Sequence, residues 1–243
     1  MANRLCLDVG NTRYKVAVFD NCDAIIHFDS FYEFEKDIFD KIVEKYQIEN
    51  GIICSTRNIN DDVTHHIQSK LNLLNMDQQL ILPVDIRYKT PKTLGKDRLA
   101  AVVAATTLYP NQNNIIIDAG TCITFDFVDR SRTYHGGNIA PGIRMRLQAM
   151  NAFTDKLPLV EPKLNQDFLG KSTEEALQNG AVKGAIFEFE SFIHHICEIF
   201  GPSSVILTGG DANYFEDTNK NKIFVHSNLV LKGLNEIMKI NDK

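Results

Sequence analysis

A short pattern that occurs twice constrains the fold of this 243-residue chain more than any other feature. In each copy an apolar run typical of a buried strand ends in an aspartate, a turn with glycine and threonine follows, and a second strand-like run begins. The aspartates are Asp8 and Asp118, so the copies lie about half a chain length apart. Two related α/β halves with a cleft between them explain this spacing, and we expect them to span residues 1–112 and 113–243.

Hydrophobic periodicity predicts similar elements in both halves, with a meander of strands followed by helices and further strands. In the first half we expect strands at 5–9, 14–19, 24–28, 51–54 and 80–82, and helices at 31–46, 63–74 and 98–108. In the second half we expect strands at 115–118, 123–128, 133–135, 205–207 and 223–225, and helices at 142–153, 172–200 and 229–240. Ser172 and Glu175 have the spacing of a capping box, which predicts that the longest helix begins there.

Composition and charge exclude several kinds of protein. No run of about 18 apolar residues could span a membrane, and the N-terminus lacks the pattern of a secretory signal. The formal net charge is −5, which argues against non-specific binding to nucleic acid because that binding depends on an excess of Lys and Arg. The cysteines are odd in number, widely spaced and without a CxxC pair, which favours a reduced, cytoplasmic compartment.

The two repeated turns contain the residue types of a phosphate-binding site. A carboxylate at the end of an apolar strand, as at Asp8 and Asp118, is costly unless it is paired or holds a cation such as Mg²⁺. Gly10 and its counterpart in the second copy allow backbone amides to approach an anion, and Lys15 supplies a positive charge. A polar β-turn explains either copy alone, but the two copies together favour a site that grips a polyphosphate from both sides. The pattern of a Walker loop does not occur.

A third polar motif, Gly95-Lys96-Asp97-Arg98, precedes an alanine-rich helical run and so places Asp97 and Arg98 at a helix N-terminus. An aspartate there suits a general base that takes a proton from a hydroxyl, and an arginine suits a fork that binds a carboxylate. From these residues alone, a helix cap at Asp97 and a surface charge at Arg98 are the simpler explanation.

Two further stretches are rich in glycine. Gly136–Gly142 contains three glycines and a proline before a helix, which indicates either a loop that closely approaches another group or a tight structural turn. Thr208–Ala212 follows an apolar strand with a double-glycine turn. Such a turn either lets a nucleoside lie against the backbone or is an ordinary connection from strand to helix.

These elements, in this order, resemble the type III pantothenate kinases, a branch of the acetate kinase/Hsp70/actin superfamily. The resemblance extends over nearly the whole chain and rests on Asp8–Lys15, Tyr88 with Gly95–Arg98, Asp118–Thr124, Gly136–Gly142, Thr154–Pro158 and Thr208–Ala212. It implies duplicated ribonuclease H-like (actin-like ATPase) domains, with the substrate motif in the first half and the adenosine motif in the second. It also implies an enzyme that phosphorylates pantothenate to 4′-phosphopantothenate with ATP, the first step of coenzyme A biosynthesis.

The resemblance implies roles for the residues of the two phosphate loops. The first loop would bind ATP through Asp8, Val9, Gly10, Asn11, Thr12, Arg13, Tyr14 and Lys15. Asp8 would lie near Mg²⁺ and reach it through phosphate or water. Thr121 would bind ATP from the second loop, and Asp118 would bind the K⁺ or NH₄⁺ ion that this family requires.

The resemblance likewise implies a pantothenate site formed by Tyr88, Gly95, Lys96, Asp97, Arg98 and Thr173. Asp97 would be the general base on the pantothenate hydroxyl, and Arg98 would bind the pantothenate carboxylate. Thr173 would reach the substrate from the other subunit, because the family forms homodimers whose sites lie at the subunit interface.

Two departures and two alternatives accompany this resemblance. Lys96 stands where small or apolar residues are commoner in the family, and Cys122 stands where alanine is usual. One alternative is a non-catalytic, nucleotide-binding accessory or regulatory protein of the same fold, although the intact acid and arginine of the substrate motif argue against it. The other is a two-metal nuclease built on Asp8, Asp97 and Asp118, which the acidic balance and the duplicated turns disfavour.

Overall fold

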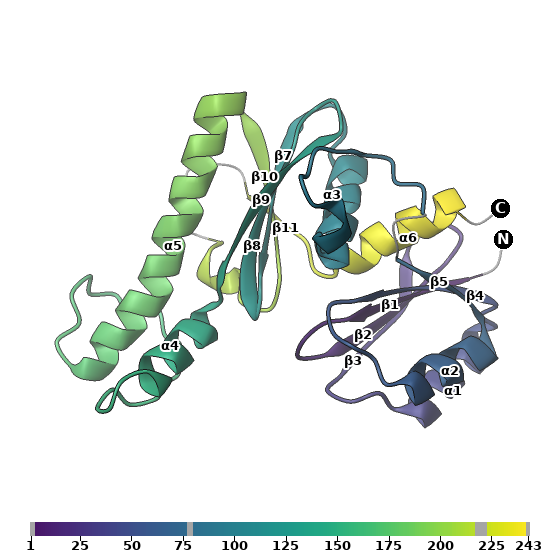
Figure 1. The fold of residues 1–243 in the computed structure, drawn as a ribbon, viewed down its shortest axis with the longest axis horizontal. Coiled ribbons are helices and arrows are strands. Elements are labelled where there is room, and N and C mark those ends of the chain that lie inside the picture. Colours follow the sequence, from purple (N-terminus) through teal and green to yellow (C-terminus); the bar gives the residue numbers. More distant parts are fainter. Residues whose placement is uncertain (1–2, 77–79, 217–222, 242–243) are drawn as a thin grey trace. The chain divides into compact units, whose positions relative to one another are not determined.

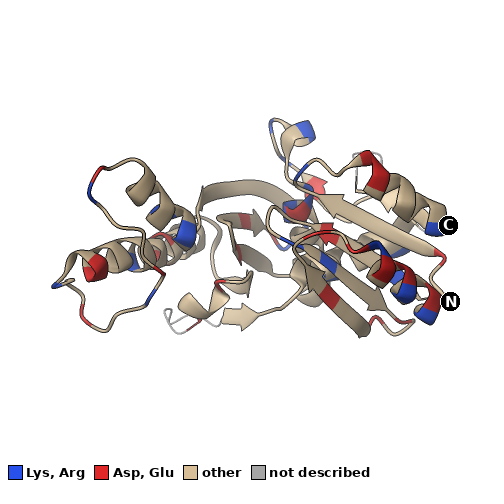
Figure 2. Cartoon of the chain, turned by 90° about the horizontal axis from the view of Figure 1, so that it is seen from below, with Lys and Arg blue, Asp and Glu red and all other residues tan. Residues whose placement is uncertain are grey.

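The computed structural model describes residues 3–76, 80–216 and 223–241. The chain divides into two compact units, the first formed by Met1–Leu108 with Asn228–Lys243 and the second by Tyr109–Ser227. Each unit is built around one sheet with its own helices (Figure 1). Acidic and basic residues are interspersed along both units (Figure 2). Within the described ranges, no helix is long and apolar enough to cross a membrane.

The sheet of the first unit is built from β1 (Arg4–Val9), β2 (Tyr14–Phe19), β3 (Ile25–Phe31), β4 (Asn50–Ser55) and β5 (Asn72–Asn75). Their order across the sheet is β3-β2-β1-β4-β5. The central strand β1 pairs antiparallel with β2 and parallel with β4. The carboxyl ends of β1 and β4 therefore lie at the same edge of the sheet.

Helices cover both faces of this sheet (Figure 1). On one face, α1 (Lys36–Tyr46) and α2 (Asp61–Lys70) share a core with Leu5, Leu7 and Val9, which are alternate residues of β1. On the other face, α6 (Leu229–Asn241) contacts β1, β2 and β4, and α3 (Lys96–Leu108) packs against α6. The short strand β6 (Asp85–Ile86) and the 3₁₀ helix η1 (Pro91–Thr93) precede α3. Burial on both faces explains why β1 is almost continuously apolar.

The second unit repeats this pairing scheme. It contains β7 (Asn113–Ala119), β8 (Cys122–Val128), β9 (Thr133–Pro141), β10 (Ser203–Thr208) and β11 (Ile223–Val225), in the order β11-β10-β7-β8-β9. β7 pairs antiparallel with β8 and parallel with β10, just as β1 does with β2 and β4. The duplicated α/β fold that the sequence predicts is confirmed.

The helices of the second unit are α4 (Ile143–Ala152), α5 (Thr173–Phe200) and the 3₁₀ helix η2 (Ala212–Tyr214). The long helix α5 begins where the capping residues predict. The Oγ atom of Ser172 accepts a hydrogen bond of 3.2 Å from the Glu175 amide. In a capping box the Glu175 carboxylate would accept a hydrogen bond from the Ser172 amide. Here it accepts one of 2.7 Å from the amide of the preceding residue, Lys171.

Three predicted elements of the first unit differ from the structure. The helix predicted at 31–46 begins later, as α1, because Phe31 still belongs to β3. The helix predicted at 63–74 ends earlier, as α2, and Asn72–Asn75 form β5 beside β4. The strand predicted at 80–82 does not form. The backbone N–H and C=O of Ile81 instead make hydrogen bonds of 2.9 and 3.0 Å with the side chain of Asn241, which satisfies the groups that a strand would pair.

The stretch Gly136–Gly142, expected as a loop or a tight turn, mostly belongs to β9. Its pairing with β8 requires glycine, because a side chain at Gly137 would collide with the backbone of Phe125. The sequence predicted that these glycines allow a close approach to another group. At Gly137 that group is the backbone of the neighbouring strand β8.

The closing helix α6 belongs to the first unit, whereas the predicted halves 1–112 and 113–243 place it in the second. It packs so closely on α3 that a side chain at Gly233 would collide with the carbonyl group of Ala100. Arg4 in β1 also donates a hydrogen bond of 2.8 Å to Asn235 in α6. Contacts between the two ends of the chain thus decide to which unit α6 belongs.

Candidate active site

The first repeated turn joins β1 to β2 and brings a buried carboxylate beside a lysine. Asp8 is the penultimate residue of β1, is 5% exposed and pairs across the sheet with Lys15 of β2. The Nζ atom of Lys15 lies 3.7 Å from Oδ2 of Asp8. Burial raises the pKa of Asp8 to about 6, with Lys15 opposing the rise and nearby Asp97 adding to it. A bound cation would relieve this cost of burying the charge.

Asp8 fits a Mg²⁺ site of the open kind. This ion commonly binds through one or two carboxylates, substrate phosphates and several waters. Among the residues that the structure describes, no group of three or more His, Cys, Asp or Glu side chains is placed to hold a metal ion by protein ligands alone. Asp8 could take part in such a site, with phosphate oxygens and water as the other ligands.

The turn after β1 is closed by a hydrogen bond of 3.0 Å from the Gly10 amide to the Arg13 carbonyl. The guanidinium of Arg13 lies 4.4 Å from the centre of the Tyr32 ring, and it donates a hydrogen bond of 2.7 Å to the Tyr32 hydroxyl. Asn11 and Thr12 are exposed at the tip of the turn. The turn is therefore a defined structure whose tip is accessible to an anion.

Asp97 lies in the first turn of α3, in the same unit as Asp8. Because α3 begins at Lys96, Asp97 is inside the helix, and the simpler sequence interpretation of a cap residue is wrong. Its Oδ1 atom accepts a hydrogen bond of 2.9 Å from the Arg98 amide. A side chain at Gly95 would approach this oxygen to 2.6 Å, so glycine keeps the carboxylate uncrowded. The charge of Asp97 raises the pKa of Asp8, which means that the two carboxylates are close enough to interact.

Two buried side chains adjoin these carboxylates. Arg98 is 6% exposed, so the interpretation of this residue as a surface charge is also wrong. Cys54 pairs with Asp8 in the register of β4 and β1 and is 1% exposed. Burial, with the charges of Asp8 and Asp97, raises the pKa of this thiol well above its usual range. Cys54 is accordingly a packing residue and not a nucleophile.

The second repeated turn, after β7, is enclosed by glycines from two other motifs. The Gly142 amide donates a hydrogen bond of 3.1 Å to the Thr121 carbonyl. A side chain at Gly142 would collide with the carbonyl groups of Gly120 and Thr121, and one at Gly209 would collide with the backbone of Ala119. Three motifs that are far apart in the sequence therefore meet at one place in the second unit.

The second aspartate occupies the same position in its sheet as the first. Asp118 is the penultimate residue of β7 and faces Thr124 in β8, as Asp8 faces Lys15. Asp118 is half-buried, and Thr121 is exposed in the turn that follows. The equivalence that the sequence repeat predicts thus extends to individual side chains.

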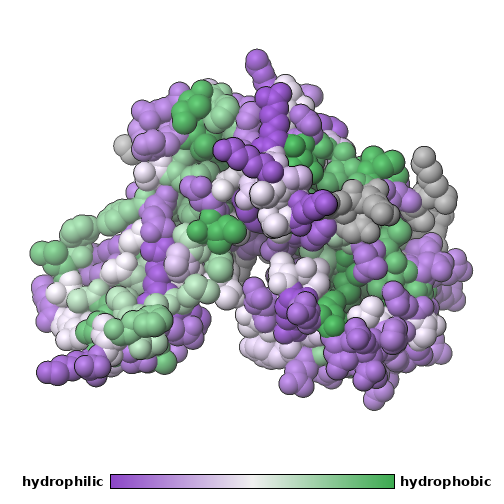
Figure 3. Space-filling model, viewed as in Figure 1, coloured by the Kyte–Doolittle hydropathy of each residue, from purple (hydrophilic) through white to green (hydrophobic). Residues whose placement is uncertain are grey.

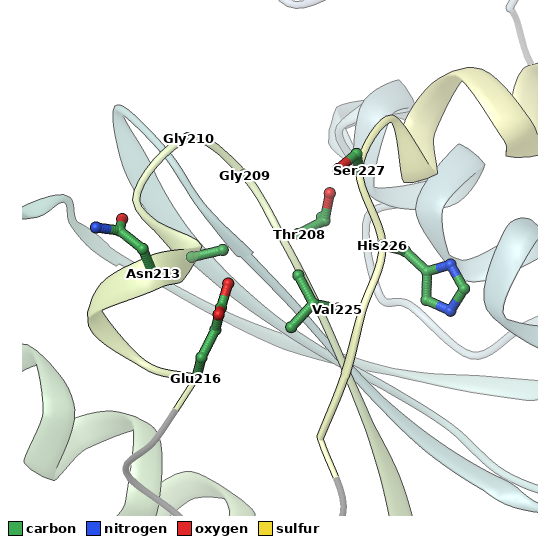
Figure 4. Close-up of a pocket in the computed structure, with 9 residues that line it drawn as sticks. Thr208, Gly209, Gly210, Asn213, Glu216, Val225, His226 and Ser227 are labelled. Atoms are coloured by element: carbon green, nitrogen blue, oxygen red, sulfur yellow. The ribbon is translucent and has the colours of Figure 1, made fainter.

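A cavity of about 250 Å³ opens beside the double-glycine turn (Figure 4). It is lined by Thr208, Gly209, Gly210, Ala212, Asn213, Glu216, Val225, His226 and Ser227. The last five of these lie outside the motifs that the sequence offers. His226 and Ser227 directly follow β11, which is parallel to β10, and the carboxyl ends of parallel strands commonly line ligand sites. A hydrogen bond of 2.7 Å between Tyr109 and Nε2 of His226 holds this wall in place.

The predicted site residues divide between the two units. The first unit brings together Asp8, Lys15 and Asp97, and Tyr88 lies half-buried in the loop between β6 and η1. Thr173 is exposed at the start of α5 in the second unit. That residues from both units act on one substrate is therefore a proposal.

The repeated sheet, with a polar turn after the central strand of each copy, is the duplicated fold of the actin-like class. A putative 2-dehydro-3-deoxygalactonokinase from Sinorhizobium meliloti shares the fold with a TM-score of 0.61 at 10% identity, over 97% of this chain and 98% of that one. A putative Baf family transcriptional activator from Campylobacter jejuni does so with a TM-score of 0.63 at 21% identity, over 98% of both chains. At these identities the two structures show the fold alone.

Sequence relatives define the family within that class. The model of the type III pantothenate kinase family matches residues 4–195. The type III pantothenate kinase of Phocaeicola vulgatus is 42% identical over 240 residues, which cover 98% of this chain and 99% of the relative. That of Flavobacterium johnsoniae is 38% identical over 234 residues, or 96% of each chain. This chain belongs to the type III pantothenate kinase family, and the resemblance drawn from its motifs is confirmed.

Proposed function

We propose that this chain transfers the γ-phosphoryl group of ATP to the primary hydroxyl of pantothenate, with Asp97 as the general base. The reaction is that of its family and makes 4′-phosphopantothenate, the first step of coenzyme A biosynthesis. One observation supports the role of Asp97 in particular. This carboxylate acts electrostatically on Asp8, which lies beside Lys15 at the first phosphate turn.

Asp97 is oriented for proton transfer by its own helix. The Arg98 amide holds one carboxylate oxygen, which leaves the other to accept the proton of the attacking hydroxyl. The buried guanidinium of Arg98 would bind the carboxylate of pantothenate and so fix the distance from that end of the substrate to the hydroxyl. Tyr88, Gly95 and Lys96 complete the pantothenate site on this side.

The first phosphate turn would stabilise the charge on the transferred group. Lys15 and backbone amides at the tip of the turn would face phosphate oxygens, and Arg13 would add a cation from its position on Tyr32. Asp8 would reach Mg²⁺ through phosphate or water. When bound, this ion neutralises charge on the phosphate oxygens.

The second unit would hold the rest of ATP. Thr121 binds a phosphate, and the nucleoside lies in the cavity beside Thr208–Ala212 (Figure 4). Asp118 binds the monovalent cation, K⁺ or NH₄⁺. The support for this role is that Asp118 occupies the position in β7 that Asp8 occupies in β1.

A homodimer would cover apolar side chains that are exposed around α4 and α5 (Figure 3). Between 50% and 87% of each of these side chains is exposed: Phe153, Leu159, Leu164, Phe168, Leu169 and Phe187. Large exposed apolar patches commonly mark protein interfaces. Thr173 begins α5 in this region and would contact pantothenate in the partner subunit.

One assay tests this function against its alternatives. The purified protein is incubated with ATP, Mg²⁺, K⁺ and pantothenate, and 4′-phosphopantothenate is measured by mass spectrometry. Failure to form product would contradict the proposed function, and ATP binding without turnover would support a non-catalytic nucleotide-binding protein. Cleavage of added RNA would support the nuclease alternative.

A further inference from the structure

The segment that follows β4 passes alongside the first phosphate turn. β1 and β4 are parallel, and Ser55 at the end of β4 pairs with Val9. The Thr56 amide donates a hydrogen bond of 3.0 Å to the Val9 carbonyl. The Ser55 hydroxyl donates one of 2.6 Å to the Arg57 carbonyl. The backbone that carries Arg57 is therefore fastened beside the turn.

The side chain of Arg57 lies against two residues of this turn. Its guanidinium carbon lies 4.6 Å from the centre of the Tyr14 ring. Its Nη1 atom donates a long hydrogen bond of 3.4 Å to the Asn11 carbonyl. A planar guanidinium stacked on a ring loses little further freedom when it binds an anion. Arg57 thus presents an oriented cation at a turn with the chemistry of a phosphate site.

Arg57 also retains hydrogen-bonding capacity that the protein does not use. Its Nε atom is buried and has no hydrogen-bond partner among the described residues. No ion pair joins Arg57 to a carboxylate in that part of the chain, whereas Arg4 lies 2.7 Å from Asp23 and Arg146 lies 2.6 Å from Glu188. The charge of Arg57 is therefore not balanced by a carboxylate of the described residues, and a bound anion would balance it.

We propose that Arg57 binds a phosphate oxygen of the nucleoside triphosphate through the terminal nitrogens of its guanidinium group. A guanidinium presents paired N–H groups that match two oxygens of one phosphate. The positive charge of Arg57 then adds to that of Lys15 at the turn. This proposal rests on the proposed placement of the polyphosphate at Asp8–Lys15. Arg57 escapes motif analysis because it lies outside that loop in the sequence and reaches it only through the pairing of β1 with β4.

Steady-state kinetics of R57Q and R57K test this role. A lost charge-assisted hydrogen bond is expected to raise the KM for ATP about tenfold or more in R57Q. The KM for pantothenate should stay within about twofold of the parent value, and R57K, which keeps the charge but not the fork, should recover part of the loss. R130Q is the matched control, because Arg130 is exposed and its loss removes the same charge.

A binding measurement separates this proposal from the proposed function. Titration calorimetry with ATP, on the parent protein and on R57Q, reports phosphate binding even if no pantothenate is phosphorylated. We expect R57Q to bind ATP about tenfold more weakly while its thermal unfolding midpoint matches that of R130Q. An unchanged ATP affinity, or a rise confined to the KM for pantothenate, would overturn the assignment of Arg57 to phosphate.

Discussion

The ammonium group of Lys15 lies 3.7 Å from a carboxylate oxygen of Asp8, whose side chain is almost completely buried. The lysine offsets only part of the cost of burial, since the pKa of Asp8 is raised to about 6. At neutral pH the ligand-free protein therefore contains an unfavourable charge. A cation bound at this turn would stabilise that charge, and so the site favours function over stability.

The raised pKa of Asp8 predicts how stability depends on pH. Asp8 titrates near 3.8 in the unfolded chain and near 6 in the folded one, so the folded state binds the proton more tightly. Its stabilising contribution is fully present below pH ~4 and is lost as the pH rises through about 6. Asp8→Asn carries no titrating group at this position, so its stability does not fall as the pH rises through about 6. Without Mg²⁺ and ATP, we expect the variant to exceed the parent in free energy of unfolding at pH 7.5 by up to about 3 kcal/mol.

Urea unfolding at pH 7.5 and at pH 4 measures this effect. The difference between Asp8→Asn and the parent should shrink at the lower pH, where Asp8 is largely protonated in the folded state. Asp85→Asn is a control at an aspartate whose side chain is 69% exposed, and it should change stability by less than about 0.5 kcal/mol. A difference of equal size at both pH values would show that the charge of Asp8 is not its cause.

Removal of the proposed general base should abolish most of the activity and leave the fold intact. Asp97→Asn keeps the shape of the side chain and its hydrogen bond from the Arg98 amide, but it cannot take up the proton of the hydroxyl. We expect kcat to fall by roughly 10²–10⁴-fold. Kinetics and circular dichroism of the same preparation check both points, and a correctly folded variant with nearly full activity would refute the assignment.

The proposed monovalent site predicts a change in the potassium requirement. Asp118→Asn removes the negative charge at the end of β7, which would attract K⁺ or NH₄⁺. We expect activity in K⁺ to fall at least about tenfold or to need a correspondingly higher K⁺ concentration. Titrations with KCl at constant ionic strength, balanced with a bulky organic cation, measure this. An unchanged K⁺ dependence would place the cation elsewhere.

The convergence of motifs in the second unit predicts opposite behaviour for two adjacent glycines. Gly209 has a φ of +100°, and a side chain there would collide with the backbone of Ala119. A side chain at Gly210 meets no atom within 4 Å. We expect Gly209→Ala to lower the free energy of unfolding by about 2 kcal/mol and to raise the KM for ATP, with Gly210→Ala changing stability by less than about 0.5 kcal/mol. Equal effects on thermal unfolding would contradict the close packing of this turn.

Several features of the fold and site follow from local patterns. The strand-turn-strand motif predicted that Asp8 and Lys15 belong to successive strands, and the antiparallel pairing of these strands sets the two residues opposite each other. Ser172 marked the start of α5 because a cap depends only on its neighbours. The strand predicted at 80–82 was wrong, since the partner of Ile81 is a side chain of the distant α6.

By itself, the sequence determined the duplication around Asp8 and Asp118 and membership of the kinase family, because both are recorded in short motifs and their order along the chain. Only the tertiary structure decided that α6 joins the first unit, that Arg57 lies over Tyr14, and that burial raises the pKa of Asp8. The physical reason is the same in each case. These properties depend on which distant segments pack together, and no local hydrophobic period specifies that choice.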